Sequence, residues 1–225
     1  MQWKQTFCAF GRICLDILFP APCNAYVLEH ISTDELFARA LRAPYDHILR
    51  TLDAEAVFSY RDPLIRNSIR AFKYMGVRTL SIPFGHALFE MVCEDIAYDV
   101  LLRTTSPLLI IPIPLSKSRF RERTYNQSEL IARAFASHCT VGSVSVDTGM
   151  LIRTRDTEKQ ALRSGRAERE ENVRNCFAIP NPDLIAGKRV ILIDDVITTG
   201  ATMREARKTL LDAGAQSVRC LAVAH

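Results

Sequence analysis

The sequence predicts an α/β protein in which helices flank a parallel sheet. In the second half of the chain, apolar segments of strand length alternate with segments whose apolar residues recur at helical spacing. One apolar segment, residues 190–193, ends in two adjacent carboxylates, Asp194 and Asp195. With 225 residues, 48% of them hydrophobic, the chain is long enough for one full core and a small additional segment.

The sequence predicts two parts: an N-terminal segment, residues 1–54, and a main domain, residues 55–225, which begins in the first half of the chain. Residues 34–52 have amphipathic helical spacing that is interrupted at Pro44. Residues 54–60 are typical of a strand. A helix is then expected from Pro63, because the first turn of a helix tolerates proline. Residues 77–102 predict a long helix whose apolar residues pack in the core.

The second half predicts the sheet and its connections. The expected elements are a buried strand at 108–115, a helix at 123–137, a strand at 144–152, a charged loop with short-helix character at 153–171, strands at 176–179 and 188–193, a helix at 202–213 ended by Gly214, and a closing segment at 217–224. Alternation of this kind implies parallel strands, whose ligands bind at the carboxyl ends.

Composition narrows the class of ligand and the compartment. The net charge of +4 suits small anionic ligands, but it is smaller than expected for a dedicated nucleic-acid-binding domain. Seven scattered cysteines indicate a reduced intracellular protein without a disulfide framework. The N-terminus lacks a signal-peptide pattern, and the longest apolar run is far shorter than the roughly 20 residues of a membrane helix. We therefore expect a cytoplasmic protein with no membrane insertion.

The acidic pair is followed by a loop of small and hydroxyl-bearing residues. Alone, Asp194 and Asp195 could cap a helix or, as in a receiver domain, bind magnesium. The next residues, Thr198 to Thr202, allow close backbone approach and offer hydroxyl donors, which suits a phosphate monoester at a helix N-terminus. No Gly-Lys-Ser/Thr ends the loop, so it is not a P-loop. The predicted ligand is a phosphorylated sugar or a nucleotide.

Residues 190–202, VILIDDVITTGAT, resemble the phosphoribosyl-diphosphate (PRPP) signature of type I phosphoribosyltransferases. Residues 57–76, 111–134 and 153–177 narrow the resemblance to the ComF (competence protein) family, and together the four segments cover nearly all of residues 57–225. The resemblance implies the type I phosphoribosyltransferase fold. It also implies that Asp194 and Asp195 are the catalytic carboxylates and hold the ribose hydroxyls.

Further site residues are implied by the same resemblance. The PRPP contacts would be Asp194, Asp195, Val196, Thr198, Thr199, Gly200, Ala201, Thr202, Ser116, Lys117 and Arg119. Of these, Ser116, Lys117 and Arg119 lie in a basic turn after residues 108–115 and would contact the diphosphate; without the resemblance, that turn is a solvated charged loop. Thr124 and Tyr125 stand where the family more commonly has glycine and phenylalanine. Magnesium is expected to bind through PRPP rather than at a protein metal site.

The charged stretch after residue 152 has two interpretations. Its mixed charges are typical of a solvated surface helix. The resemblance implies instead a flexible lid that closes over the substrate, with Arg153, Thr157, Gln160 and Arg166 matching the family pattern.

The cysteines at positions 8, 14 and 23 are candidates for a metal site. Family members often carry CxxC pairs near the N-terminus that would bind zinc. Here Cys23 matches the first pair, but Tyr26 stands where its second cysteine belongs. Three irregularly spaced thiols do not complete a four-ligand site, so we expect a degenerate finger without zinc.

Two function classes stay open at this point. In the first, the chain is a phosphoribosyltransferase that uses PRPP and an unidentified acceptor. In the second, it is a non-catalytic PRPP sensor or a single-stranded-DNA-binding module that works with DNA uptake proteins. Phe120 and Tyr125, interleaved with the basic residues 117–123, could stack bases while the cations neutralise phosphates.

Overall fold

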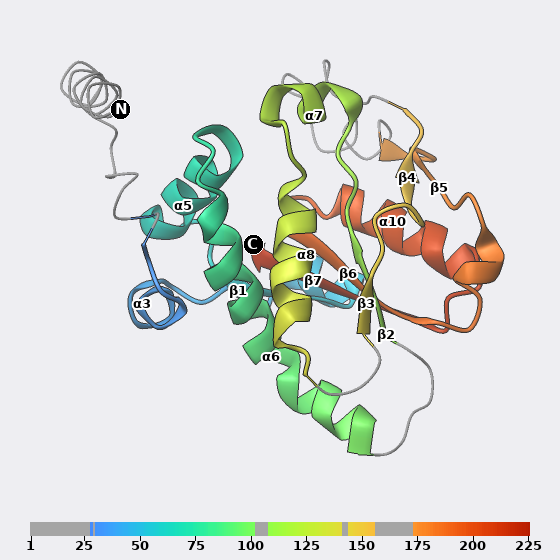
Figure 1. Ribbon diagram of the computed structural model, residues 1–225, viewed down its shortest axis with the longest axis horizontal. Helices are drawn as coiled ribbons and strands as arrows, with labels where there is room; N and C mark the ends of the chain where they lie inside the picture. Colours follow the sequence, from blue (N-terminus) through green and yellow to red (C-terminus); the bar gives the residue numbers. More distant parts are fainter. Residues whose placement is uncertain (1–27, 29, 102–107, 141–143, 156–172) are drawn as a thin grey trace, which may run out of the picture.

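A parallel five-stranded sheet forms the centre of the molecule in the computed structural model, which describes residue 28 and residues 30–101, 108–140, 144–155 and 173–225 (Figure 1). Its strand order is β1-β7-β6-β2-β3. The strands are β1 (Ala54–Phe58), β2 (Leu108–Pro112), β3 (Val144–Val146), β6 (Arg189–Val196) and β7 (Ser217–Ala224). Two short strands, β4 (Ile152–Arg153) and β5 (Phe177–Ala178), pair antiparallel beside it. The predicted α/β class with a parallel sheet is confirmed.

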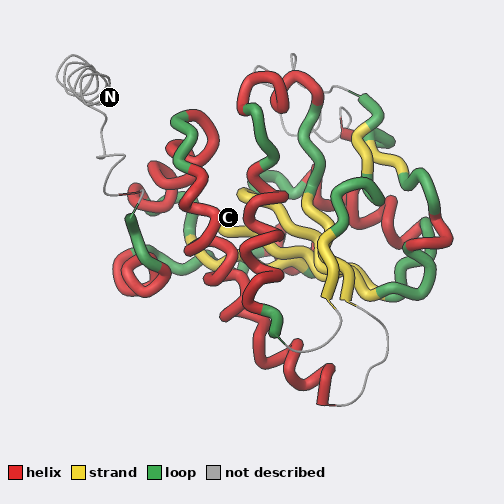
Figure 2. The backbone as a smooth tube through the Cα atoms, viewed as in Figure 1, coloured by secondary structure: helices red, strands yellow, loops and turns green. Residues whose placement is uncertain are grey.

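Helices cover both faces of the sheet (Figures 1 and 2). One face carries α5 (Pro63–Tyr74), α6 (Ser81–Leu101) and α8 (Gln127–His138), and the other carries α4 (His47–Leu52) and α10 (Ala201–Asp212). Along β6, Ile191 and Ile193 pack into the first core, whereas Val190 and Leu192 pack into the second. The strand is therefore apolar on both sides, which explains why its sequence is a continuous run of hydrophobic residues.

The N-terminal half of the chain is part of this sheet. Ala54 of β1 pairs with Cys220 of β7, and Arg219 bonds both Glu55 at 2.8 Å and Asp95 of α6 at 2.7 Å. Helix α3 (Thr33–Arg39) begins with a capping box formed by Ser32 and Glu35 and contacts α6. Helix α4 also packs on the sheet, through Leu49 and Leu52. The domain boundary between residues 54 and 55 stays a prediction.

A close helix contact fixes α8 over the sheet. Gly85 of α6 faces α8 so closely that an added Cβ would lie 2.5 Å from Ala134 Cβ and 2.6 Å from the Phe135 nitrogen. Only a residue without a side chain allows this approach. At the N-terminal end of α8, Ser128 donates to Asp194 near the carboxyl end of β6.

Three predicted elements differ from the structure. The basic turn after β2 is the helix α7 (Lys117–Arg123), because the Ser116 hydroxyl caps it by accepting from the Arg119 N–H at 3.3 Å. The helix expected from residue 123 therefore begins only at Gln127. The strand expected at 144–152 is split into β3 and β4, since Asp147 Oδ1 accepts from the Gly149 and Met150 N–H groups and closes a turn.

The remaining short elements connect this framework. Single 3-10 turns occur at η1 (Arg78–Leu80) and η2 (Pro182–Leu184). No helix within the described ranges has both the length and the apolar character needed to cross a membrane. Cys8, Cys14 and Cys23, on which the finger prediction rests, lie outside the described residues.

Candidate functional site

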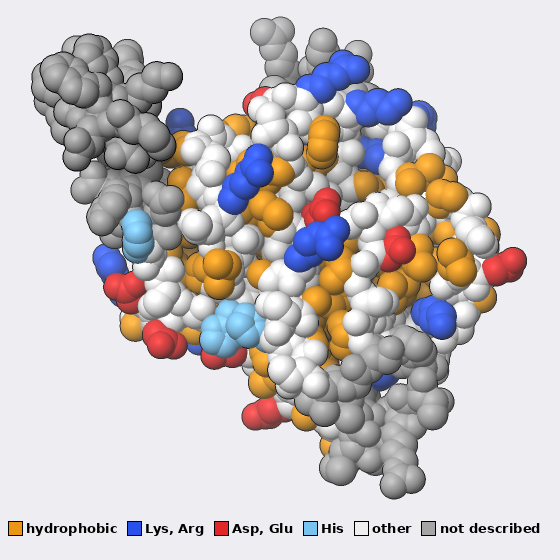
Figure 3. Space-filling model, viewed as in Figure 1, with side chains coloured by type: hydrophobic (Ala, Val, Ile, Leu, Met, Phe, Trp, Pro, Cys, Tyr) orange, Lys and Arg blue, Asp and Glu red, His pale blue; other side chains and the backbone are white. Residues whose placement is uncertain are grey.

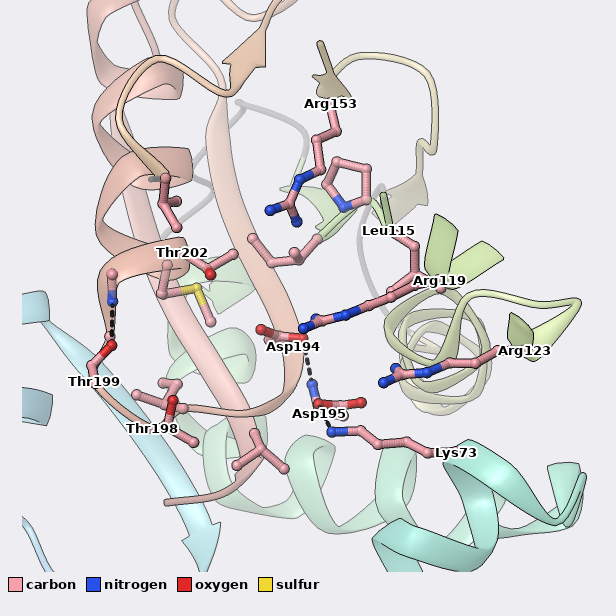
Figure 4. A pocket seen from close by; sticks show the side chains of 18 of the residues that line it. Lys73, Leu115, Arg119, Arg123, Arg153, Asp194, Asp195, Thr198, Thr199 and Thr202 are labelled. Atoms are coloured by element: carbon pink, nitrogen blue, oxygen red, sulfur yellow. Dashed lines mark hydrogen bonds and ion pairs between the residues drawn. The ribbon is translucent and has the colours of Figure 1, made fainter. Parts of the chain in front are cut away.

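A pocket of about 550 Å³ opens at the carboxyl edge of the sheet, within the size range of small-molecule sites (Figure 4). Its walls come from α5, the β2–α7 connection, α7, β4, the end of β6 and the start of α10. The polar and charged residues that line it are Tyr60, Lys73, Tyr74, Arg119, Glu122, Arg123, Arg153, Asp194, Asp195, Thr198, Thr199 and Thr202. The predicted acids and hydroxyl loop are thus brought together in one cavity.

The two acids are the last polar residues of β6, which continues through them to Val196. Asp194 Oδ1 accepts from the Ser128 hydroxyl at 2.9 Å and from the Asp195 backbone N–H at 2.8 Å. Burial, assisted by the neighbouring Asp195 charge, raises the pKa of Asp194 to about 6. The cation of Lys73 and the two hydrogen bonds oppose this shift in part. Asp194 therefore changes its charge close to neutral pH.

Asp195 is paired with a lysine that the sequence analysis did not single out. Lys73 Nζ lies 2.8 Å from Asp195 Oδ1, and both side chains are mostly buried, with 16% and 10% of their surface exposed. Lys73 follows Ile65 and Ile69 at four-residue spacing on the buried side of α5. A lone cation that continues an apolar helix face is the signal that could have identified it.

The loop after β6 is held in place from behind. Gly200 has a φ of +74°, and an added Cβ would lie 2.4 Å from Leu52 Cδ1 of α4, so this position requires glycine. His225 Nδ1 lies 2.8 Å from the Ile197 carbonyl oxygen, which accepts its proton, and Nε2 lies 2.9 Å from Asp46 Oδ2. Since Asp46 also caps α4, this network joins the loop to the helix that supports it.

The remaining predicted residues divide into three groups. Arg119, Arg153, Val196, Gly200 and Ala201 line the pocket with the residues above. Ser116 and Lys117 do not: Ser116 is buried as the cap of α7, and Lys117 is exposed outside the cavity. Thr157, Gln160 and Arg166 of the predicted lid lie outside the described residues.

Cations surround the acids on several sides. Figure 4 shows Lys73 extending from α5 and Arg119 and Arg123 extending from α7 toward Asp194 and Asp195, with Arg153 above them. Figure 3 shows further Lys and Arg side chains along the edge of the molecule formed by α7. A pocket with acids at its centre and cations around it suits a ligand that has both hydroxyl and anionic groups.

Comparison with known proteins agrees with this description. Residues 125–225 match the family model "Phosphoribosyl transferase domain". The chain is 30% identical over 164 residues to competence protein ComFC of Bacillus subtilis, covering 71% of this chain and 58% of that protein. It is 35% identical over 122 residues to the DNA utilization protein YhgH of Escherichia coli K12, covering 52% of this chain and 50% of that protein.

A solved structure described as the allosteric regulatory enzyme of purine biosynthesis aligns with 22% identity and a TM-score of 0.36, over 64% of this chain and 26% of that one. The chain spans about half the length of the curated relatives that it matches.

Proposed function

Because the chain belongs to the ComF family and has the type I phosphoribosyltransferase fold, we propose that its pocket binds PRPP. The observation that carries the proposal is the position of the two acids. They end β6 within the same pocket as the Thr198–Thr202 loop and several cations. PRPP has ribose hydroxyls in its middle and phosphate groups at both ends, so its chemistry matches this distribution of groups.

The 5-phosphate would bind at the start of α10. This helix has 12 residues, and its N-cap residue, Gly200, contributes no side-chain cap to the first turn. Backbone N–H groups and the positive end of the helix dipole would meet the phosphate there, with the hydroxyls of Thr198, Thr199 and Thr202 as further donors. Binding at this end, remote from the reacting carbon, would position the sugar.

The ribose and the diphosphate would occupy the other half of the pocket. Asp194 and Asp195 would accept hydrogen bonds from the ribose hydroxyls, while Arg119 and Arg153 would face the diphosphate. Ser116 and Lys117 remain predicted diphosphate contacts that would need α7 to move. When the diphosphate leaves, positive charge develops on the ribose, and the two carboxylates would stabilise it.

Magnesium fits this pocket as an ion held mainly by the ligand. Within the described part of the chain, no three His, Cys, Asp or Glu side chains gather as a metal-binding group, and the pocket offers two adjacent carboxylates. Mg²⁺ commonly binds through one or two carboxylates together with substrate phosphates. When bound, magnesium would neutralise charge on the departing diphosphate.

We propose that the reaction is transfer of the phosphoribosyl group to an acceptor, in a cytoplasmic protein connected to DNA uptake. The connection rests on the competence proteins among its relatives. A second candidate function is binding of single-stranded DNA without catalysis. It is favoured by α7, on which Phe120 is 52% exposed between the exposed cations Lys117, Arg119 and Arg121.

Titration calorimetry with PRPP, with and without magnesium, tests the proposal. The unmodified protein should bind PRPP, and Asp195→Asn should weaken binding while keeping the fold. Release of diphosphate in the presence of an acceptor panel then distinguishes transfer from sensing. If PRPP does not bind, or if Asp195→Asn binds it as tightly as the unmodified protein, the placement of the sugar is wrong. Binding of single-stranded DNA that persists in Asp194→Asn and Asp195→Asn would favour the second function.

A further inference from the structure

One wall of the pocket is built by an arginine and a tyrosine that the PRPP proposal does not use. Arg123 is the last residue of α7, and Tyr74 is the last residue of α5. The Arg123 guanidinium lies over the Tyr74 ring, 5.1 Å from its centroid, and Nη2 donates to the Tyr74 hydroxyl at 3.3 Å. Both residues line the cavity.

Arg123 is a buried cation with neutral partners. Only 9% of its surface is exposed. Its Nη1 donates to Gln127 Oε1 at 3.0 Å, whereas its Nε has no hydrogen-bond partner in the described part of the chain. Within the same residues, no carboxylate lies in ion-pair range of this guanidinium. A buried charge without a counter-ion is costly, so a guanidinium held this way is suited to receive an anion.

Tyr74 presents the other half of the site. Its side chain is 59% exposed although Arg123 covers one face of the ring, so much of the remaining ring faces solvent at the pocket. Exposed aromatic faces bind planar rings by stacking. Tyr74 lines the same pocket as Asp194 and Asp195, the proposed ribose position, and it follows Lys73, which pairs with Asp195.

We propose that Tyr74 and Arg123 form the acceptor subsite, and that the acceptor is a small planar nitrogen heterocycle bearing a carboxylate. The proposal rests on the function proposed above and specifies its acceptor. The ring would stack on Tyr74 and the carboxylate would pair with Arg123. A ring nitrogen would then bond to the anomeric carbon of PRPP as the carbon–oxygen bond to the diphosphate breaks. The diphosphate takes that electron pair, and a proton on the nitrogen is released to solvent.

The burial of Arg123 favours a small acid over a nucleic acid. Phosphates along a strand reach exposed cations most easily, and α7 offers these at Lys117 and Arg121. A guanidinium inside the pocket is accessible to a group at the end of a small molecule. The subsite therefore differs from the α7 surface considered above for single-stranded DNA.

Orotate and uracil are the matched probes, because they share one ring and differ in the carboxylate. Their affinities would be measured by calorimetry on the full chain saturated with ribose 5-phosphate. We expect orotate to bind at least about tenfold more tightly than uracil, and Arg123→Gln to remove that preference. Tyr74→Ala should weaken orotate about tenfold, whereas Tyr74→Phe should retain most of the affinity.

Tyr98→Ala is the control, because Tyr98 is 62% exposed on α6 and does not line the pocket. Equal affinities for orotate and uracil in the unmodified protein would overturn the proposal, as would equal effects of Tyr74→Ala and Tyr98→Ala. The proposal would also be overturned if the unmodified protein does not bind orotate, while Tyr74→Ala and Arg123→Gln both weaken its binding of oligothymidylate.

Tyr74→Ala changes an exposed side chain, so the test stands even if Arg123→Gln does not fold. PRPP binding is measured on the same samples. Intact PRPP binding without a preference for orotate overturns the acceptor subsite alone, whereas loss of both overturns the proposed function as well.

Discussion

Lys73 Nζ lies 2.8 Å from Asp195 Oδ1, so a lysine at the end of α5 neutralises one of two adjacent acids at the end of β6. The pair joins the N-terminal half of the chain to the proposed ribose site. It also limits the repulsion between Asp194 and Asp195, since the Lys73 cation lowers the pKa that burial raises at Asp194.

Removing this cation should destabilise the fold. Lys73→Met leaves Asp195 mostly buried without its partner, and we expect the free energy of unfolding at pH 7.5 to fall by about 3 kcal/mol. Urea denaturation measures the change. The double variant Lys73→Met/Asp195→Asn should recover part of the loss, because it leaves no unpaired charge. Additive effects of the two single changes would show that the pair contributes no coupling.

Asp194→Asn should stabilise the protein above pH 6. The pKa of Asp194 is about 6 in the folded state and 3.8 ordinarily, so the folded state retains a proton between these values and loses stability as the pH rises through them. Asn keeps the oxygen that accepts from Ser128 and carries no charge. We expect a gain of about 1 to 3 kcal/mol at pH 8, and little difference near pH 4. Asp212→Asn, at an exposed position on α10, should give no comparable gain.

The same carboxylate should set the pH range of PRPP binding. In the proposed complex an ionised Asp194 would accept from ribose hydroxyls, and protonation near pH 6 would weaken that role. Affinity should therefore decrease as the pH falls through 6. Since phosphate monoesters also titrate near pH 6, the Asp194→Asn variant supplies the reference profile. Identical pH profiles for the two proteins would contradict a role for this carboxylate.

Gly200 should tolerate no side chain. Gly200→Ala introduces a Cβ where Leu52 stands and imposes strain at a φ of +74°, so we expect a loss of about 2 kcal/mol in stability. Gly200→Val should be worse and should also obstruct the phosphate. Gly187→Ala is the control for backbone strain alone, because Gly187 has a φ of +69° with nothing within 4 Å of an added Cβ. Equal losses at the two positions would show that the Leu52 contact is unimportant.

Thr124→Gly should stabilise the protein. Thr124 ends α7 in a left-handed conformation, with a φ of 65°, which is unfavourable for a β-branched residue and natural for glycine. We expect a rise of about 1 kcal/mol in the free energy of unfolding, measured by thermal or urea denaturation. Thr124→Ala removes the hydroxyl without relieving the backbone and should bring no such gain.

The sequence predicts the inner strands β2, β6 and β7 well because they are apolar on both faces. The alternation of Ile191 and Leu192 between two cores makes β6 a continuous hydrophobic run, and the acids that end it stand out. Helix α5 was predicted from Pro63 and begins there, capped by Asp62. These features depend on local spacing, which a sequence displays directly.

Features that depend on distant contacts were harder to predict. The pairing of Lys73 is not visible in the sequence, because its partner lies 122 positions away along the chain. Helix α7 differs from the predicted turn for a local reason: its basic residues are also typical of a solvated loop, and the Ser116 cap is the signal that distinguishes the helix. The Tyr74 and Arg123 contact likewise joins two helix ends that no spacing rule connects.

The pairing of β1 with β7 has a consequence for how the chain is made. Ala54 emerges from the ribosome long before Cys220, its partner in the sheet. Until β7 has been synthesised, the edge of β1 that pairs with it has no hydrogen-bonding partner. Contacts between residues so far apart in the sequence are also slow to form. Nascent chains should therefore depend on chaperones to avoid aggregation during this interval, and should acquire protease resistance only after β7 has been synthesised.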